Sequence, residues 1–296
     1  MNFKAENIVT VILISLSIIL YFVGFYFREI SNGAAHTDFQ LHIWILINDF
    51  EQDYIRTLKN YLTYNEATFP FYHSIHSIFN PFKSNYLSFT FSNTILNLFI
   101  LFIFYYFIKK KITLNNFNLS ILLLPSIFLL SPWFRSTSFW GTTENFALFF
   151  LIPACYYLFL LFKDQDNYKT NFLLTLFISL TIYSRQQFLF LALTHIAILA
   201  INADFKKLLN TFIYYFFLSL PGIYTYYIWG VFSNLNNATS ASNYISLQNI
   251  FINIPKISTL IFFYLIPIFL INIKTIRKIL NFKEFFIYFI FIIFVE

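Results

Sequence analysis

Acidic and imidazole side chains gather between residues 28 and 86. Four of the five histidines lie there, and two of them flank an acid in the run His36-Thr37-Asp38-Phe39-Gln40-Leu41-His42. Asp38 and His42 are four residues apart, so in a helix they share one face. A carboxylate there is suited to act as a general base toward a hydroxyl group, and an imidazole can orient it or bind a phosphate. The alternatives are a solvated loop with a capping aspartate, or a metal site made by His36, Asp38 and His42.

A second group of polar side chains begins at Phe69-Pro70. The residue before a proline avoids helical backbone angles, and proline itself favours the first turn of a helix, so a helix is predicted to begin here. Tyr72, His73 and His76 fall in the first turns of this helix. They favour a polar site, and the alternative is a membrane-interface helix with an aromatic belt.

Three isolated charges complete the set. Glu144 stands at the start of a long apolar run, where a helix N-terminus tolerates a carboxylate, and Arg135 has no acid nearby in the sequence. Arg185 interrupts nearly continuous apolar sequence from Phe172 to Ile201, so it needs a partner at membrane depth. A phosphate at the membrane interface would suit its guanidinium group. The alternatives are an ion pair with Glu144 or Asp38, or a side chain that reaches the lipid headgroups.

The composition identifies the elements that must position these side chains. Hydrophobic residues make up 58% of the 296 residues and charged residues only 11%, against about a quarter in soluble domains, which excludes a soluble globular protein. The apolar runs lack the alternation of barrel strands, and several can cross about 30 Å of hydrocarbon as helices. We therefore expect an all-α, polytopic transmembrane bundle. It would be a single domain over residues 1–296, with about nine spans near 8–27, 87–108, 119–130, 146–162, 172–183, 188–201, 208–231, 257–273 and 285–295.

Separate predictions concern the first and the last apolar run of the chain. The first apolar run is predicted to be a span, and a signal peptide cleaved near Gly33-Ala34-Ala35 is the alternative. The last run is too short to span a membrane, which suggests that the C-terminal part of the bundle is missing.

The distribution of basic residues predicts the orientation of the bundle. Twelve of the 19 lysines and arginines fall on the side of the N-terminus, which the positive-inside rule assigns to the cytoplasm. The net charge of +6 is therefore explained by topology, and no nucleic-acid partner is expected. The inner loops contain no glycine-rich phosphate loop, so a nucleotide site is not expected either. On the outer side this topology gathers Asp38, His42, His73, Arg135, Glu144 and Arg185, as a single extracytoplasmic site requires.

The order of four short motifs resembles the GT-C superfamily of polytopic glycosyltransferases. These motifs are Asp38-x-x-x-His42, Phe69-Pro70-x-Tyr72, Thr143-Glu144-Asn145 and Ser184-Arg185-Gln186-Gln187. Within that superfamily the pattern looks most like the dolichyl-phosphate-glucose-dependent alpha-1,2-glucosyltransferases that finish the N-glycan precursor. The resemblance covers roughly residues 30 to 190, and Phe39 stands where those proteins commonly have a second acid.

The resemblance implies an inverting transfer of a sugar from a polyprenyl-phosphate donor to an acceptor hydroxyl group on the extracytoplasmic or lumenal side. Asp38 would be the general base, with Arg185, His42 and Arg135 at the donor phosphate. The remaining substrate contacts would come from Tyr72, His73, Glu144 and Gln186. The acceptor would be a glycan, lipid-linked or protein. No cofactor is implied, and a divalent metal is left open. The membrane would be the bacterial inner membrane, or alternatively the endoplasmic reticulum.

Two other functions share this kind of fold. A lipid-linked oligosaccharide flippase or another transporter would place charges within several spans rather than in one outer loop. An O-antigen polymerase or ligase would use arginines and a histidine in a large late outer loop, yet residues 232–255 contain neither.

Overall fold

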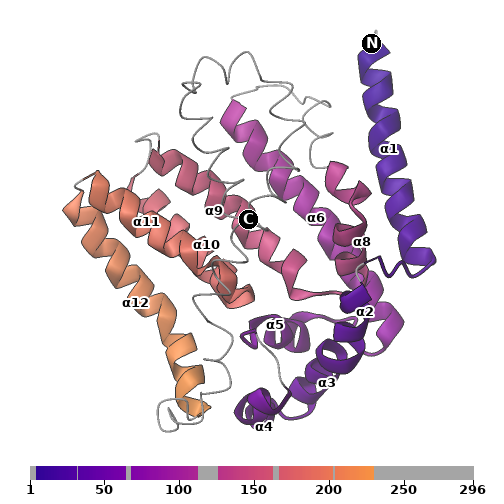
Figure 1. The fold of residues 1–296 in the computed structure, drawn as a ribbon, viewed down its shortest axis with the longest axis horizontal. Helices are drawn as coiled ribbons and strands as arrows, with labels where there is room; N and C mark the ends of the chain where they lie inside the picture. Colours follow the sequence, from indigo (N-terminus) through magenta and orange to yellow (C-terminus); the bar gives the residue numbers. More distant parts are fainter. Residues whose placement is uncertain are drawn as a thin grey trace, which may run out of the picture. The chain divides into compact units, whose positions relative to one another are not determined.

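The computed structural model describes residues 5–31, 33–64, 68–112, 126–162, 167–202 and 204–229, all within the compact unit Met1–Trp229. Every regular element in these ranges is a helix (Figure 1), which confirms the predicted all-α class. The predicted spans 257–273 and 285–295, and most of 119–130, lie outside the described residues.

Six long helices follow predicted apolar runs. Two of them are long and apolar enough to cross a membrane, namely residues Tyr86–Lys110 and Thr143–Phe162, while Thr10–Tyr26 and Gln186–Ile201 form shorter apolar helices. A helix of about 20 residues spans about 30 Å. The six helices are α1 (Ala5–Tyr26), α6 (Tyr86–Ile112), α9 (Thr143–Phe162), α10 (Tyr168–Ser184), α11 (Leu189–Ile201) and α12 (Phe205–Ile228).

Helix α10 begins four residues before its apolar run because polar residues cap it. The side chain of Asn167 accepts a hydrogen bond from the Thr170 amide at 3.0 Å, and the Thr170 hydroxyl accepts one from the Asn167 amide at 2.6 Å. This reciprocal capping satisfies two amide groups that a helix start otherwise leaves unpaired. The helix therefore extends to Tyr168, beyond the predicted boundary at Phe172.

Short helices between α1 and α6 form a separate layer, called here the loop layer. Asp53 caps α4 by accepting a hydrogen bond from the Arg56 amide at 3.0 Å. Helix α5 begins directly after Pro70, as predicted. The layer consists of α2 (Gly33–Asp38), the π-helical turn η1 (Phe39–Ile43), α3 (Trp44–Gln52), α4 (Tyr54–Asn60), η2 (Tyr61–Tyr64) and α5 (Phe71–Phe79). Figure 1 shows this layer at one end of the long helices.

Three further short elements connect the long helices. The 3-10 turn η3 (Ile127–Leu130) leads into α8 (Pro132–Phe139), and η4 (Gln186–Phe188) joins α10 to α11. Ser131 caps α8 and Pro132 occupies its first position, where a missing amide hydrogen costs nothing.

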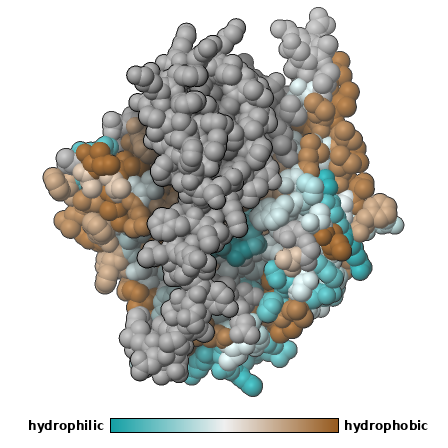
Figure 2. All heavy atoms as spheres, in the orientation of Figure 1, coloured by the Kyte–Doolittle hydropathy of each residue, from teal (hydrophilic) through white to brown (hydrophobic). Residues whose placement is uncertain are grey.

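Three apolar clusters hold the unit together, and the smallest of them lies in the loop layer around Leu46, Phe50 and Tyr61. The first joins α1, η1, α5, α6 and α8 through fully buried rings such as Tyr21, Phe39 and Phe89. The second joins α9, α10 and α11, with α12 packed against it. Large apolar side chains also remain exposed, and Figure 2 shows them over α1 and over the α11 and α12 side, whereas the loop layer shows hydrophilic residues mixed with apolar ones. This distribution suits helices that face lipid.

A buried polar network joins α10, α11 and α12. His195 Nε2 donates to Asn171 Oδ1 at 2.8 Å, and its Nδ1 lies 3.1 Å from the Tyr215 hydroxyl. The Asn171 amide donates in turn to the Thr211 hydroxyl at 2.8 Å. His195 is the one histidine outside the predicted outer loop, and its bonds give it a structural role between these three helices.

Candidate functional site

The predicted outer segments meet at the loop layer. The indole of Trp229, just after α12, donates to the Leu58 carbonyl at 2.8 Å and stacks on Tyr61 with ring centroids 5.6 Å apart. Phe69 packs against Tyr183 near the end of α10 at 5.5 Å, and Phe71 packs against Phe146 in the first turn of α9 at 5.9 Å. The ends of α9 and α10 thus contact α5, and the end of α12 contacts α4, within the same loop layer.

Arg185 and Glu144 form an ion pair at this end of the unit. Arg185 directly follows α10, and its guanidinium group contacts Glu144 Oε1 in the first turn of α9. Both side chains are mostly buried, with 21% and 27% exposed. The second carboxylate oxygen of Glu144 is buried and has no hydrogen-bond partner among the described residues. An ion pair with Glu144 is one of the alternatives that the sequence leaves open for Arg185, and the structure contains this pair. Oε2 of Glu144 remains available to accept a hydrogen bond.

Arg135 has an acidic partner that is remote in the sequence. Its Nε lies 2.8 Å from Glu29 Oε2 and its Nη2 lies 2.9 Å from Oε1, so the planar fork of the guanidinium group is occupied. Burial raises the pKa of Glu29, but the hydrogen bonds from Arg135 and Ser31 and the charge of Arg135 outweigh it and keep that pKa below its ordinary value. The sequence does not reveal this pair because 106 residues separate its members.

Helix α5 places Tyr72, His73 and His76 in the interior. His73 is fully buried, and its Nδ1 lies 3.2 Å from the Tyr61 hydroxyl. His76 Nδ1 lies 3.1 Å from the Asn80 side chain, and the Nε2 atoms of both histidines are buried with no hydrogen-bond partner in the described ranges. Burial lowers the pKa of His73 and of His76 to about 3, so both are neutral at pH 7. They can donate or accept a hydrogen bond, but they do not supply a positive charge for a phosphate.

The turn between α8 and α9 packs its backbone against this interior. Gly141 has a φ angle of +60°, and a Cβ atom there would lie 2.3 Å from Asn93 Nδ2 and 2.9 Å from the Tyr72 hydroxyl oxygen. Glycine is therefore required both for the backbone angle and for the space. Sequence analysis missed Asn93, which is buried on α6. The signal that could have revealed it is the pair Asn93 and Asn97, one turn apart in an otherwise apolar helix.

Asp38 and His42 are not paired with each other. Asp38 ends α2, is exposed, and makes no hydrogen bond or ion pair within the part of the chain that the structure describes. The π-helical turn η1 follows it, and such turns are frequent at functional sites. His42 Nδ1 donates instead to the Tyr64 carbonyl at 3.1 Å. The structure therefore presents Asp38 as a carboxylate without a hydrogen bond or ion pair in the described part of the chain, while Arg185 directly follows α10 and Gln186 begins η4.

The described residues contain no group of three or more His, Cys, Asp and Glu side chains that could hold a metal ion. The rings of the predicted alternative are engaged elsewhere, because His36 packs edge-on against Trp140 at 4.3 Å and His42 bonds to Tyr64. The structure does not assemble His36, Asp38 and His42 into a site.

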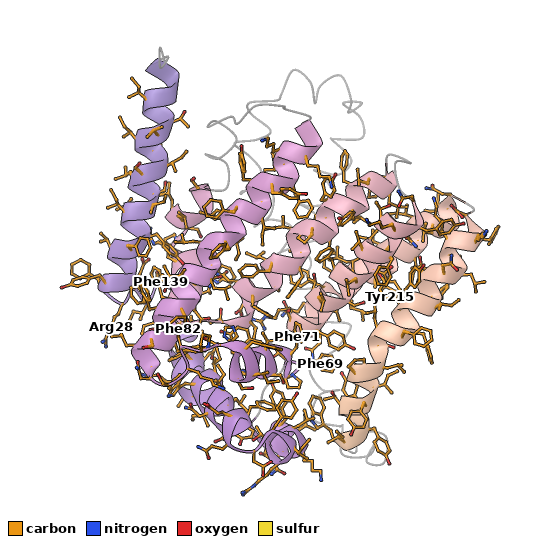
Figure 3. All side chains as sticks on the ribbon, turned by 180° about the vertical axis from the view of Figure 1, so that it is seen from behind. Arg28, Phe69, Phe71, Phe82, Phe139 and Tyr215 are labelled. Atoms are coloured by element: carbon orange, nitrogen blue, oxygen red, sulfur yellow. The ribbon has the colours of Figure 1, made fainter. Side chains whose placement is uncertain are left out.

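An apolar cavity of about 640 Å³ lies between α10, α11 and α12. Phe69 from the loop layer and Tyr215 from α12 both line it, and Figure 3 labels both side chains. Tyr183 and Leu189 line it as well, and Arg185 lies between them in the chain. An apolar cavity whose lining residues flank a cation in the chain suits an amphiphile with an anionic head.

Comparison with known protein families, with curated proteins and with solved structures finds no match to this chain. The geometry of the described residues and the four sequence motifs are therefore the basis for proposing a function.

Proposed function

We propose that this protein is a multi-span membrane glycosyltransferase that moves a sugar from a polyprenyl-phosphate donor to an acceptor hydroxyl group on the extracytoplasmic side. One observation carries the proposal: Tyr183 and Leu189, which line the apolar cavity between α10, α11 and α12, flank Arg185 in the chain, and Arg185 pairs with Glu144 at the end that bears the loop layer. A polyprenyl chain needs an apolar site open toward lipid, and its phosphate needs a cation at the membrane interface.

The donor would bind with its first isoprene units in this cavity and its phosphate at Arg185. The phosphate would share the guanidinium group with Glu144 or replace it, because the planar fork of arginine suits both anions. During transfer the phosphate gains negative charge as it leaves the anomeric carbon. Arg185 would stabilise that charge where it develops, which lowers the barrier more than equally strong ground-state binding would.

Asp38 would activate the acceptor. Its carboxylate is exposed and free of hydrogen bonds and ion pairs among the described residues, so it can accept the proton of an acceptor hydroxyl group. Attack from the face opposite the leaving phosphate would invert the configuration at the anomeric carbon. The mechanism requires the bound acceptor to place its hydroxyl group between Asp38 and the anomeric carbon.

The basic residues support the proposed orientation. Lys109 and Lys110 lie near the end of α6, and Lys206 and Lys207 lie at the start of α12, at the helix ends remote from the loop layer. The N-terminal end of α1 lies at that same end (Figure 1). The positive-inside rule assigns this end to the cytoplasm and the loop layer to the opposite side. A bacterial inner membrane is the favoured location, with the endoplasmic reticulum as the alternative.

The proposal is tested by sugar transfer from a panel of radiolabelled polyprenyl-phosphate sugars, using membranes that contain the full-length protein. We expect Asp38→Asn to lower transfer by about 100-fold or more, because the amide cannot take the proton. Glu51→Gln is the matched control, since Glu51 is an exposed acid of the same layer that pairs with Lys83 at 3.2 Å, and it should keep wild-type transfer.

Protein levels in the membrane must be measured for each variant. Equal transfer by the wild type and Asp38→Asn would remove Asp38 from the chemistry. Absence of transfer from every donor in the panel would contradict the enzyme and favour a flippase.

A further inference from the structure

Helix α1 ends in a backbone motif that normally requires glycine. The Glu29 amide donates to the Gly24 carbonyl at 2.9 Å and the Arg28 amide donates to the Phe25 carbonyl at 3.0 Å, which is the Schellman arrangement. The left-handed position of this motif is held by Arg28, with a φ angle of +52°, the one non-glycine residue with positive φ in the described ranges. An L side chain is strained there, so an arginine at this position calls for an explanation.

A second cavity, of about 340 Å³, lies beside Arg28. Its walls come from the end of α1, the start of α6 and the end of α8, and they are mainly aromatic and apolar. Figure 3 shows Arg28 and Phe139 together at this corner. The lining includes Phe25, Tyr86, Leu87, Phe139 and Trp140. Because α6 is one of the two helices long and apolar enough to cross a membrane, its first turn marks the level of the membrane interface.

The charge of Arg28 is unopposed at this corner. Its neighbour Glu29 is held by both arms of Arg135 and by the Ser31 hydroxyl at 2.6 Å. The Arg28 side chain makes no hydrogen bond or ion pair within the described residues. Two of the lining residues are largely exposed, Tyr26 by 79% and Leu87 by 57%. A single cation therefore lines a mainly apolar cavity whose walls are partly exposed.

We propose that this corner binds an anionic phospholipid, with part of one acyl chain in the cavity and the headgroup phosphate at Arg28. The aromatic lining suits the interfacial region of a bilayer, and the unopposed positive charge favours a net-negative headgroup over a zwitterionic one. The proposal requires that α6 crosses the membrane, but it does not depend on sugar transfer. Its failure and the failure of the proposed enzyme activity are therefore distinguishable.

The test uses the full-length protein in nanodiscs that contain phosphatidylcholine and phosphatidylglycerol, with the retained lipids counted by native mass spectrometry. We expect the wild type to retain phosphatidylglycerol preferentially and Arg28→Gly to reduce that preference about fivefold. Arg28→Lys keeps the charge and should keep most of the preference. The control Arg56→Gln removes an exposed cation from α4 and should change nothing.

The thermal unfolding midpoint separates a binding role from a structural one. Glycine relieves the left-handed backbone strain, so Arg28→Gly should unfold at the wild-type temperature or higher while it loses the lipid preference. Addition of millimolar glycerol 3-phosphate should not displace the lipid, because the acyl chain anchors it. A preference that survives in Arg28→Gly, falls equally in Arg56→Gln, or is abolished by glycerol 3-phosphate would overturn the proposal.

Discussion

At the scale of single residues, the function of each charge depends on its partner. Arg135 and Arg185 are both isolated in the sequence, yet Glu29 occupies the fork of Arg135 from two directions, whereas Glu144 keeps one oxygen without a hydrogen-bond partner in the described part of the chain. Arg185 also lies in the chain between Tyr183 and Leu189, which line the cavity between α10, α11 and α12. We therefore assign the donor phosphate to Arg185 and a structural tie to Arg135.

The first residue-scale prediction concerns Arg185→Lys. Lysine keeps the positive charge but loses the planar fork, so we expect kcat/KM for the polyprenyl-phosphate donor to fall by about 10- to 100-fold, while KM for the acceptor stays unchanged. Steady-state kinetics with each substrate varied in turn measures both quantities. Arg56→Lys, on the surface of α4, is the control. Equal effects on donor and acceptor would instead indicate that Arg185 only supports the fold.

The second concerns the buried histidines His73 and His76. Their pKa of about 3 in the folded protein lies below the ordinary value of about 6.5, so between these pH values the unfolded chain binds more protons. Stability is therefore complete above about pH 6.5 and declines as the pH falls toward 3. Thermal unfolding in detergent between pH 7.5 and 5 measures the slope. His76→Phe removes one titrating group and should flatten it; an unchanged slope would contradict the assignment.

At the scale of elements, the loop layer depends on one tight turn. Gly141 lets the backbone between α8 and α9 approach Asn93 on α6 and Tyr72 on α5, so that this turn meets two further helices. Larger side chains elsewhere in the apolar clusters can shift to relieve a contact, but a backbone turn with positive φ has no such freedom. The geometry of the helix ends around α5 follows from this position.

We expect Gly141→Ala to destabilise the protein by about 2–4 kcal/mol, because it combines left-handed strain with a short contact to the Asn93 amide. The double variant with Asn93→Ala removes the contact but keeps the strain, so it should recover part of the loss. Unfolding in detergent with increasing denaturant, analysed as a double-mutant cycle, gives the coupling. Additive effects of the two substitutions would show that a side chain at position 141 does not clash with Asn93.

At the scale of the whole molecule, the loop layer lies at one end of the long helices, and the end of α6 and the start of α12, each with lysines, lie at the other (Figure 1). Lys59 is exposed on α4 in the loop layer, and Lys110 is exposed near the end of α6. If α6 crosses the membrane, a reagent that cannot permeate the bilayer reaches one end only. The orientation of the candidate site relative to the membrane is therefore measurable with two positions.

In a Cys155→Ala background, we expect Lys59→Cys to react with a membrane-impermeant maleimide in intact cells, and Lys110→Cys to react only after permeabilisation. The control is a denatured sample in which both cysteines react fully. The reverse pattern would place the loop layer in the cytoplasm and exclude transfer on the extracytoplasmic side. Labelling of both positions in intact cells would contradict a membrane-spanning α6.

The sequence by itself determined the helical class and the approximate bounds of six long helices, because uninterrupted apolar runs have few other stable arrangements. It also placed the start of α5 at Pro70, since proline restricts the backbone locally. The boundary of α10 was missed by four residues because capping by Asn167 depends on side-chain geometry that hydropathy does not register.

Only the tertiary structure decided which charges are paired, which histidines are buried and where the cavities lie. The Arg135–Glu29 pair joins residues 106 positions apart, and no local pattern encodes such a distance. Asp38 and His73 show the same limit. Both are polar residues of the same predicted loop, yet Asp38 is exposed and His73 is fully buried. Burial and pairing arise from how helices pack, and many packings share one hydropathy pattern.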